Sequence, residues 1–197
     1  MSPVSVIAEA LAALAEGLGS AGIRWYLFGA QAAILYGVPR LTADVDATAE
    51  YPVDQAEKLA RLLLGAGFEP RVGEIGAFAR HTRVIPLAHV STGIPVDLVL
   101  AGAGLEEEFL DRAQLIDVGG VRVPVITADD LIVTKVLAGR SKDLEDVRDV
   151  LRQQSVSLDL DRIRRLLSAL EAALDRADLL PALEAALNAT KEDGTRR

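Results

Sequence analysis

The stretch of sequence that decides the fold is WYLFGAQAAILYGVPRLTADVDATA, residues 25–49. It contains, in order, an apolar strand, a glycine turn at Gly29, a short helix, a Gly-Val-Pro-Arg loop and an Asp-x-Asp pair. Side chains at positions i and i+2 of a strand point to the same face of its sheet. We therefore expect residues 43–47 to be extended and to project Asp44 and Asp46 side by side.

The Asp-x-Asp pair predicts a metal site. Two carboxylates held side by side repel each other unless a cation lies between them. Ligand sets made only of oxygen favour hard divalent cations, so Mg²⁺ or Mn²⁺ is the expected ion. The alternative is a pair of solvent-facing acids on an edge strand. Arg40 and Thr42 just before the pair, and the glycine turn at Gly29, favour the metal site.

A third carboxylate is expected from another strand. Asp97 lies within IPVDLVL, residues 94–100, which is apolar on both sides of it. A charged aspartate in an apolar strand is costly unless it has a partner. A metal ion shared with Asp44 and Asp46 would satisfy it, and we favour this interpretation. The alternative is a carboxylate at a strand end that accepts a hydrogen bond from a backbone amide.

The glycine turn at Gly29 predicts a phosphate-binding position. It lies where the strand ends and the helix begins, and the amide groups and dipole at a helix N-terminus attract phosphate. The alternative is a strand-to-helix turn that binds no ligand. A phosphate-binding turn beside metal-binding carboxylates indicates nucleotide chemistry.

A second informative block is DDLIVTKVLAGRSKDLEDVRDVL, residues 129–151. Lys135 has apolar neighbours, which suggests a lysine at the edge of a cleft, where a mobile point charge can meet nucleotide phosphates. The alternative is a surface lysine. Helical spacing places Asp143 and Asp146 near each other. Lys142 and Asp143 form a structural ion pair in one interpretation, and Asp146 is either structural or a base or positioning group.

Both blocks resemble the polymerase-β-type nucleotidyltransferases, and most closely the abortive-infection type II (AbiEii-like) branch. The first block follows the pattern Gly-Gly/Ser, small helix, Gly-x-x-Arg-x-Thr-x-Asp-hydrophobic-Asp. The second follows Lys-x-x-x-Ala-x-Arg-x-Lys-Asp-x-x-Asp, and the resemblance spans about residues 25–151. The chain departs from the pattern at Ala30, where Gly or Ser is usual. Ala30 keeps the backbone amide that phosphate can bind, and the Gln31 amide could replace the missing hydroxyl.

The resemblance implies an α/β (α+β) fold, a nucleotidyltransferase-type mixed sheet flanked by helices with a C-terminal helical part. It implies Mg²⁺-dependent transfer of a nucleoside monophosphate from an NTP to an acceptor, which is RNA or protein. The catalytic and metal-binding residues would be Asp44, Asp46 and Asp97. The nucleotide-binding residues would be Gly29, Ala30, Gln31, Arg40, Thr42, Lys135, Lys142, Asp143 and Asp146. Relatives in this branch often act as toxins of toxin–antitoxin pairs, so an antitoxin partner is implied.

Two rival functions stay open. The fold could persist as a non-catalytic module that binds a nucleotide or a partner, with Ala30 as a sign of decay. The chain could also be a small-molecule nucleotidyltransferase of the antibiotic-modifying kind. A toxin-like enzyme should slow growth when it is expressed, whereas a drug-modifying enzyme should not.

The composition bounds these expectations. The chain has 197 residues, of which 50% are hydrophobic, and a net charge of −8, which argues against a broad nucleic-acid-binding surface. It has no cysteine, which excludes disulfides and thiolate metal sites, and its two histidines leave little room for zinc. No apolar run is long enough to cross a bilayer, and we expect a cytoplasmic protein with no membrane association.

The expected organisation has three parts. Residues 1–126 form the nucleotidyltransferase core, residues 127–189 form a helical region that completes the cleft, and residues 190–197 form a disordered tail. Within the core, the glycine-containing segment 73–80 is expected to be irregular. A basic cluster between the acidic strands either receives the triphosphate or an acceptor polyanion, or is a solvated loop. Its members are Arg71, Arg80, His81 and Arg83.

Overall fold

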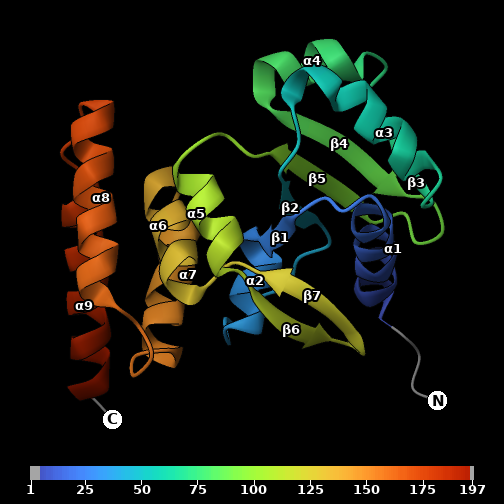
Figure 1. Cartoon of the computed structure of the whole chain (residues 1–197). Coiled ribbons are helices and arrows are strands. Elements are labelled where there is room, and N and C mark those ends of the chain that lie inside the picture. Colours follow the sequence, from blue (N-terminus) through green and yellow to red (C-terminus); the bar gives the residue numbers. More distant parts are fainter. Residues whose placement is uncertain (1–4, 196–197) are drawn as a thin grey trace. The chain divides into compact units, whose positions relative to one another are not determined.

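The computed structural model describes residues 5–195 and confirms the predicted fold class (Figure 1). Within these residues seven strands form one mixed sheet in the order β3-β4-β5-β2-β1-β7-β6. The strands are β1 (Trp25–Phe28), β2 (Val45–Ala49), β3 (Phe68–Pro70), β4 (Val84–His89), β5 (Pro95–Leu100), β6 (Gln114–Val118) and β7 (Val121–Val125). Strand β2 lies in the middle and pairs antiparallel with β1 and parallel with β5.

Helices precede, connect and follow the strands. They are α1 (Val6–Ser20), α2 (Gly29–Leu35), α3 (Ala56–Leu64), α4 (Ile75–Thr82), α5 (Leu105–Arg112), α6 (Ala128–Ala138), α7 (Ser141–Gln153), α8 (Leu160–Leu174) and α9 (Leu179–Thr195), with a 3₁₀ turn η1 (Val53–Gln55). None of the helices in the described part of the chain is long and apolar enough to span a membrane.

The chain divides into two compact units. The first unit comprises residues up to Gln31 and Leu41–Ile126, and the second comprises Ala32–Arg40 and Thr127–Arg197. The first unit contains the whole sheet with α1, α3, α4 and α5, and the second contains α6 to α9. The segment 32–40, which the sequence places in the core, therefore belongs with the C-terminal helices.

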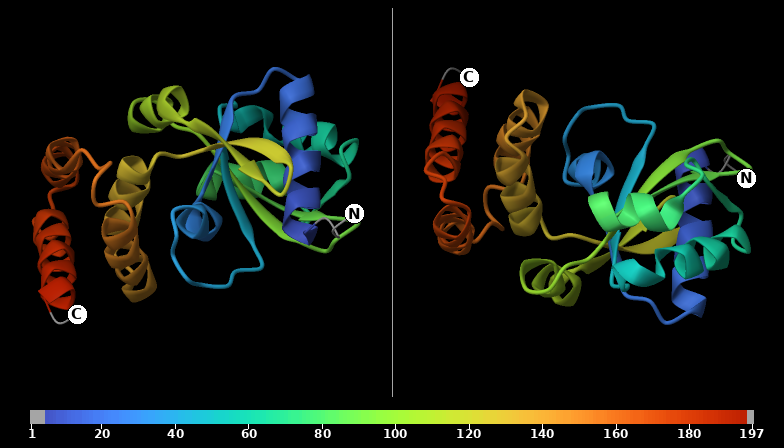
Figure 2. Two further views of the ribbon diagram at one scale, coloured as in Figure 1. Left: turned by 90° about the horizontal axis from the view of Figure 1, so that it is seen from below. Right: turned by 90° about the horizontal axis from the view of Figure 1, so that it is seen from above.

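In the first unit the two faces of the sheet differ. Helices α1, α3 and α4 cover one face, where the alternate side chains of β4 and β5 are fully buried (Figure 2). The opposite face carries Tyr26 and Thr48, which are register partners. The ring of Tyr26 meets Phe109 of α5 edge-on, with centroids 6.5 Å apart. Helix α5 thus closes one end of this second face and leaves the other end open.

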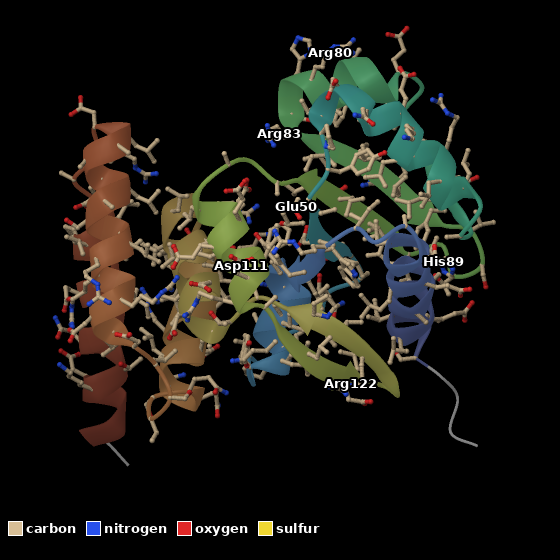
Figure 3. All side chains as sticks on the ribbon, viewed as in Figure 1. Glu50, Arg80, Arg83, His89, Asp111 and Arg122 are labelled. Atoms are coloured by element: carbon tan, nitrogen blue, oxygen red, sulfur yellow. The ribbon has the colours of Figure 1, made fainter. Side chains whose placement is uncertain are left out.

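Ion pairs help to hold α5 at this end of the sheet. Arg24, just before β1, contacts Glu50 at 2.7 Å and Asp111 of α5 at 2.5 Å. Figure 3 shows Glu50 and Asp111 at this end of the sheet. The three side chains are substantially exposed, so the pairs contribute little stability and mainly fix the position of α5.

The structure differs from the sequence-based expectation at α4. Its glycines and mixed pattern predict an irregular segment, whereas Ile75–Thr82 is helical. A Cβ at Gly76 would lie 2.5 Å from Oε1 of Glu57, so α4 lies close to the end of this α3 side chain. Ile75 and Ala79 supply its buried side. Packing against α3 therefore outweighs the weak intrinsic helix propensity of this segment.

The second unit consists of packed helices. Helix α6 begins with Thr127 as its N-cap, whose hydroxyl accepts a hydrogen bond from the amide of Asp130 at 3.2 Å. Helix α6 contacts α7, α8 and α9. Helix α9 continues to Thr195, so residues 190–195, for which the sequence predicts a disordered tail, are helical; residues 196 and 197 lie outside the described residues.

Candidate active site

Two of the three predicted acids are neighbours on the sheet. Asp46 of β2 and Asp97 of β5 are register partners on adjacent parallel strands. Partners of this kind lie about 4.8 Å apart and point to the same face. Both side chains are partly exposed, on the face that α5 leaves open. Asp44 precedes β2 by one residue and is exposed.

Gly29 is fitted to Asp46. Its φ is +66°, a left-handed conformation that side chains with a Cβ rarely adopt. A Cβ built at this position would lie 2.1 Å from Oδ2 of Asp46, closer than any real contact. The glycine predicted as a phosphate-binding turn is therefore required by the position of a predicted metal ligand.

Polar contacts also hold the loop that carries Asp44. The side-chain amide of Gln31 donates to the backbone carbonyl of Asp44 at 3.3 Å, and Gln31 is only 8% exposed. The hydroxyl of Thr42 donates to the carboxylate of Asp44. Ala30, beside Gln31, is buried. Of the residues predicted to bind nucleotide, Gln31 and Thr42 thus contact a predicted metal ligand.

Asp97 has a cationic partner that the sequence does not predict. The guanidinium of Arg71 forms an ion pair with the Asp97 carboxylate, and the two side chains are 39% and 46% exposed. The Nε of Arg71 donates to the carbonyl of Leu87 at 2.9 Å. The backbone amide of Arg71 donates to the carbonyl of Pro86, the register partner of Asp97, at 2.9 Å. Arg71 is therefore fixed to the strand that adjoins Asp97.

The predicted basic cluster is not one site. Arg83 donates to the carbonyl of Leu100 at 2.7 Å and lies away from Arg80 in the view of Figure 3. Arg80 lines a surface groove between α3 and α4, together with acidic and apolar side chains. His81 is exposed, and its Nδ1 lies 2.9 Å from a backbone carbonyl of its own helix. Of the four residues in this cluster, Arg71 alone has a described ion pair with a predicted catalytic acid.

The three acids fit a divalent cation in their chemistry and backbone placement. All are carboxylates; Asp46 and Asp97 are register partners on adjacent strands, and Asp44 lies just before β2. As the side chains stand, however, the described residues contain no group of three or more acids and histidines close enough to hold one ion. In this arrangement the Asp97 carboxylate is paired with Arg71. A shared ion would require the Asp97 carboxylate to leave Arg71.

In the second unit the predicted lysine is buried between carboxylates. The ammonium of Lys135 lies 2.6 Å from Asp146 and 3.2 Å from Asp143, and its side chain is only 6% exposed. Asp143 also pairs with Arg140, and Asp146 with Arg40 at 2.5 Å. These contacts join α6, α7 and the segment 32–40 of the second unit.

The sequence predicts an ion pair between Lys142 and Asp143 as one interpretation. In the structure Asp143 pairs with Lys135 and Arg140 instead, and Lys142 is exposed. Burial alone would raise the pKa of the Asp143 carboxyl. The hydrogen bond from Arg140 and the charge and hydrogen bond of Lys135 outweigh it, so the pKa lies below its usual value. Asp143 is therefore held ionised as part of a structural network.

The pKa of Tyr36 leads to a test at alkaline pH. Burial, with the charges of Asp129 and Asp130 as smaller causes, raises the pKa of Tyr36 to about 12. An unfolded tyrosine ionises near pH 10. The folded state therefore keeps the proton more tightly, and its contribution to stability is complete below about pH 10 and is lost as the pH rises toward 12. We expect Tyr36→Phe to flatten the fall of the thermal midpoint between these pH values, and an unchanged slope would contradict this role.

Known proteins resemble this chain in sequence and in fold. A family model described as a nucleotidyltransferase of unknown function (DUF6036) matches residues 15–180. The chain belongs to this family. The match includes the acids of the first unit and the buried lysine network of the second. A comparison with curated protein sequences gave no significant match.

Solved structures similar in fold to this DUF6036 chain include a nucleotidyltransferase-like protein and an antibiotic-resistance factor. An antigenic nucleotidyltransferase-like protein from Paracoccidioides brasiliensis is 23% identical, with a TM-score of 0.53 over 89% of this chain and 91% of that one. The antibiotic-resistance factor ANT(2'')-Ia is 14% identical in a solution structure, with a TM-score of 0.56 over 87% and 94%. Its complex with adenylyl-2''-tobramycin is 15% identical, with a TM-score of 0.55 over 83% and 95%. At these identities the likeness is one of fold.

The contact between Gly29 and Asp46 makes a prediction with a matched control. Gly29→Ala should lose about 1–2 kcal/mol from its left-handed backbone and should also displace the Asp46 carboxylate. Gly22 has the same φ of +66°, and a methyl group added there would meet nothing within 4 Å, so Gly22→Ala carries only the backbone cost. The midpoint of thermal unfolding and the rate of nucleotidyl transfer should both fall further in Gly29→Ala than in Gly22→Ala. Equal losses in the two variants would show that the fit to Asp46 is unimportant.

Proposed function

We propose that this DUF6036 protein is a divalent-metal-dependent nucleotidyltransferase that moves a nucleoside monophosphate from an NTP to an acceptor hydroxyl. Asp44, Asp46 and Asp97 would be its catalytic and metal-binding residues. The observation that carries the proposal is the register pairing of Asp46 with Asp97 on the open face of the sheet. Membership of a nucleotidyltransferase family supports the reaction class.

The residues around the acids would position the metal ligands and leave room for the nucleotide. Mg²⁺ or Mn²⁺ bound there would neutralise charge on the triphosphate and activate the acceptor hydroxyl. Gln31 and Thr42 hold the backbone and the carboxylate of Asp44, so they would orient this ligand. Gly29 leaves room for Asp46, and its lack of a side chain suits the close approach of a phosphate to the backbone.

The buried network of the second unit has a different part. We propose that Lys135, Asp143 and Asp146 are structural, because their charges compensate one another at 2.6 and 3.2 Å away from solvent. Arg40 would join them as a structural cation, since it pairs with Asp146. Lys142, which is exposed, stays a predicted nucleotide ligand.

The sequence resemblance and the shared fold favour two different classes of acceptor. The resemblance to the AbiEii-like branch favours RNA or protein as acceptor and an antitoxin as partner. The fold shared with the antibiotic-resistance factor ANT(2'')-Ia favours a small molecule. Both acceptors offer a hydroxyl, so the proposed reaction at the three acids is the same.

The test is transfer of label from α-³²P NTPs. The purified chain is incubated with each of the four NTPs, Mg²⁺ or Mn²⁺, and total RNA, a protein extract or an aminoglycoside. Label in one acceptor class, lost when EDTA is added, is the expected result. Slowed growth on expression should accompany label in RNA or protein and should be absent with an aminoglycoside acceptor. No label in any class under these conditions would contradict the enzyme.

A second candidate is a nucleotide-binding module without catalysis. The ion pair between Arg71 and Asp97 favours it, because a carboxylate occupied by a guanidinium is not available to a metal ion. Such a module should bind NTP with the same affinity in EDTA as in Mg²⁺ and transfer nothing. A divalent-dependent affinity would separate the enzyme from the module.

A further inference from the structure

Arg71 and Asp97 form a contact that bears directly on the proposed metal site. Asp97 is the register partner of Asp46 on β5, so its carboxylate stands beside a second carboxylate on the same face. Like charges at such a separation repel, and a nearby cation offsets the repulsion. The guanidinium of Arg71 supplies that positive charge within the chain itself.

The backbone of Arg71 is fixed to β4, and its guanidinium bridges β4 and Asp97. Its backbone amide donates to Pro86 and its Nε donates to Leu87, both at 2.9 Å, and both carbonyls belong to β4. Only the terminal Nη2 reaches Asp97. Because the guanidinium is planar and rigid, it leaves Asp97 as one unit and gives up the Leu87 carbonyl at the same time. The Arg71 side chain is 39% exposed, so solvent lies beside it to receive the displaced group.

We propose that Arg71 is a positioning residue: it holds the Asp97 carboxylate as its counter-cation until a divalent cation displaces it, and the displaced guanidinium then binds nucleotide phosphate. This inference rests on the proposed function, since it presumes a metal ion at the three acids. A planar guanidinium with several donors suits both partners, first a carboxylate and then a phosphate. The two roles give effects of opposite sign when the arginine is removed.

The test measures the binding of Mn²⁺ alone, by the loss of the free-ion electron paramagnetic resonance signal. Arg71→Gln should bind Mn²⁺ about two- to fivefold more tightly than the wild type, the range that an exposed ion pair supplies. At saturating Mn²⁺, the same variant should bind α,β-methylene-ATP about five- to tenfold more weakly, because a charge-assisted contact is lost. Neither readout depends on turnover.

Two controls isolate the contact. Arg80→Gln removes the same charge from α4, where Arg80 lines a separate groove, and should change neither affinity. In an Asp97→Asn background the carboxylate that Arg71 holds is absent, so Arg71→Gln should no longer tighten Mn²⁺ binding. Such non-additivity is the signature of two groups in direct contact.

The outcomes separate this inference from the proposed function. Mn²⁺ affinity equal in the wild type and Arg71→Gln, or nucleotide affinity unchanged by the substitution, overturns the role of Arg71 while leaving the metal site intact. Mn²⁺ bound by neither protein overturns the metal site, and the role of Arg71 falls with it. Tighter Mn²⁺ binding together with weaker nucleotide binding confirms it.

Discussion

Asp46→Asn is expected to lower the rate of nucleotidyl transfer by more than about 100-fold while leaving the fold intact. Loss of a residue that merely supports a metal ligand costs about 10–100-fold, and Asp46 is proposed as a ligand itself. Asparagine keeps the shape that fits Gly29 but removes the negative charge. Because Asp46 lies beside Asp97 in register, the substitution also relieves like-charge repulsion in metal-free protein.

The measurements are transfer of labelled nucleotide and thermal unfolding in EDTA. Asp54→Asn, which removes a charge from the exposed η1 turn, is the matched control and should change neither. Transfer that persists in Asp46→Asn would contradict the catalytic role. A thermal midpoint that falls by much more than in the control would mean that Asp46 mainly supports the fold, and the loss of transfer would then carry no mechanistic meaning.

Lys135→Met is expected to destabilise the second unit by about 3 kcal/mol. Methionine keeps the apolar stem of the side chain but leaves two buried carboxylates without their shared ammonium, and breaking a buried pair in this way typically costs about 3–5 kcal/mol. The lower end applies because Arg140 still pairs with Asp143 and Arg40 with Asp146. The measurement is the free energy of unfolding in urea.

Lys142→Met is the matched control for stability alone, since it removes an exposed lysine from the same helical hairpin and should cost little. NTP affinity is compared with the wild type instead, because Lys142 is itself a predicted nucleotide ligand. Lys135→Met/Asp146→Asn also removes one of the two buried carboxylates, and the Arg40 side chain that it releases is 25% exposed, so the double variant should recover part of the loss. NTP affinity is measured on the same proteins well below their unfolding midpoints. A Lys135→Met variant as stable as the control but with weaker NTP binding would restore the sequence-based role of Lys135 as a phosphate ligand.

Much of the fold could be predicted because local patterns specify it. The apolar run before Gly29 becomes β1, and β2 begins within the Asp-x-Asp pair. Each of these rests on neighbours within a few residues, where strand alternation and turn chemistry operate. Helix α4 could not be predicted in this way, because its stability depends on the burial of Ile75 and Ala79 against other elements, including α3 and β4.

The candidate site was harder to predict than the fold. The sequence pairs Asp44 with Asp46 and gives Asp97 as a third acid, whereas the register places Asp46 beside Asp97 and Asp44 lies before β2. It does not identify Arg71 as the partner of Asp97, because that contact joins positions 26 residues apart across strand β4. It also misses the burial of Lys135, whose partners lie beyond the turn at Gly139 on another helix.

The segment 32–40 also constrains how this protein can be made. It belongs to the second unit, although the chain of the first unit continues for another 86 residues after it, from Leu41 to Ile126. During synthesis, Arg40 is made 106 positions before its partner Asp146. The carbonyl of Tyr36 is made 118 positions before its partner Gln154. At about 5–20 residues per second on a ribosome, that delay is roughly 6–24 s. A protein truncated at Ile126 would carry this segment permanently without its partners, so the two units are coupled during synthesis even though they are compact separately.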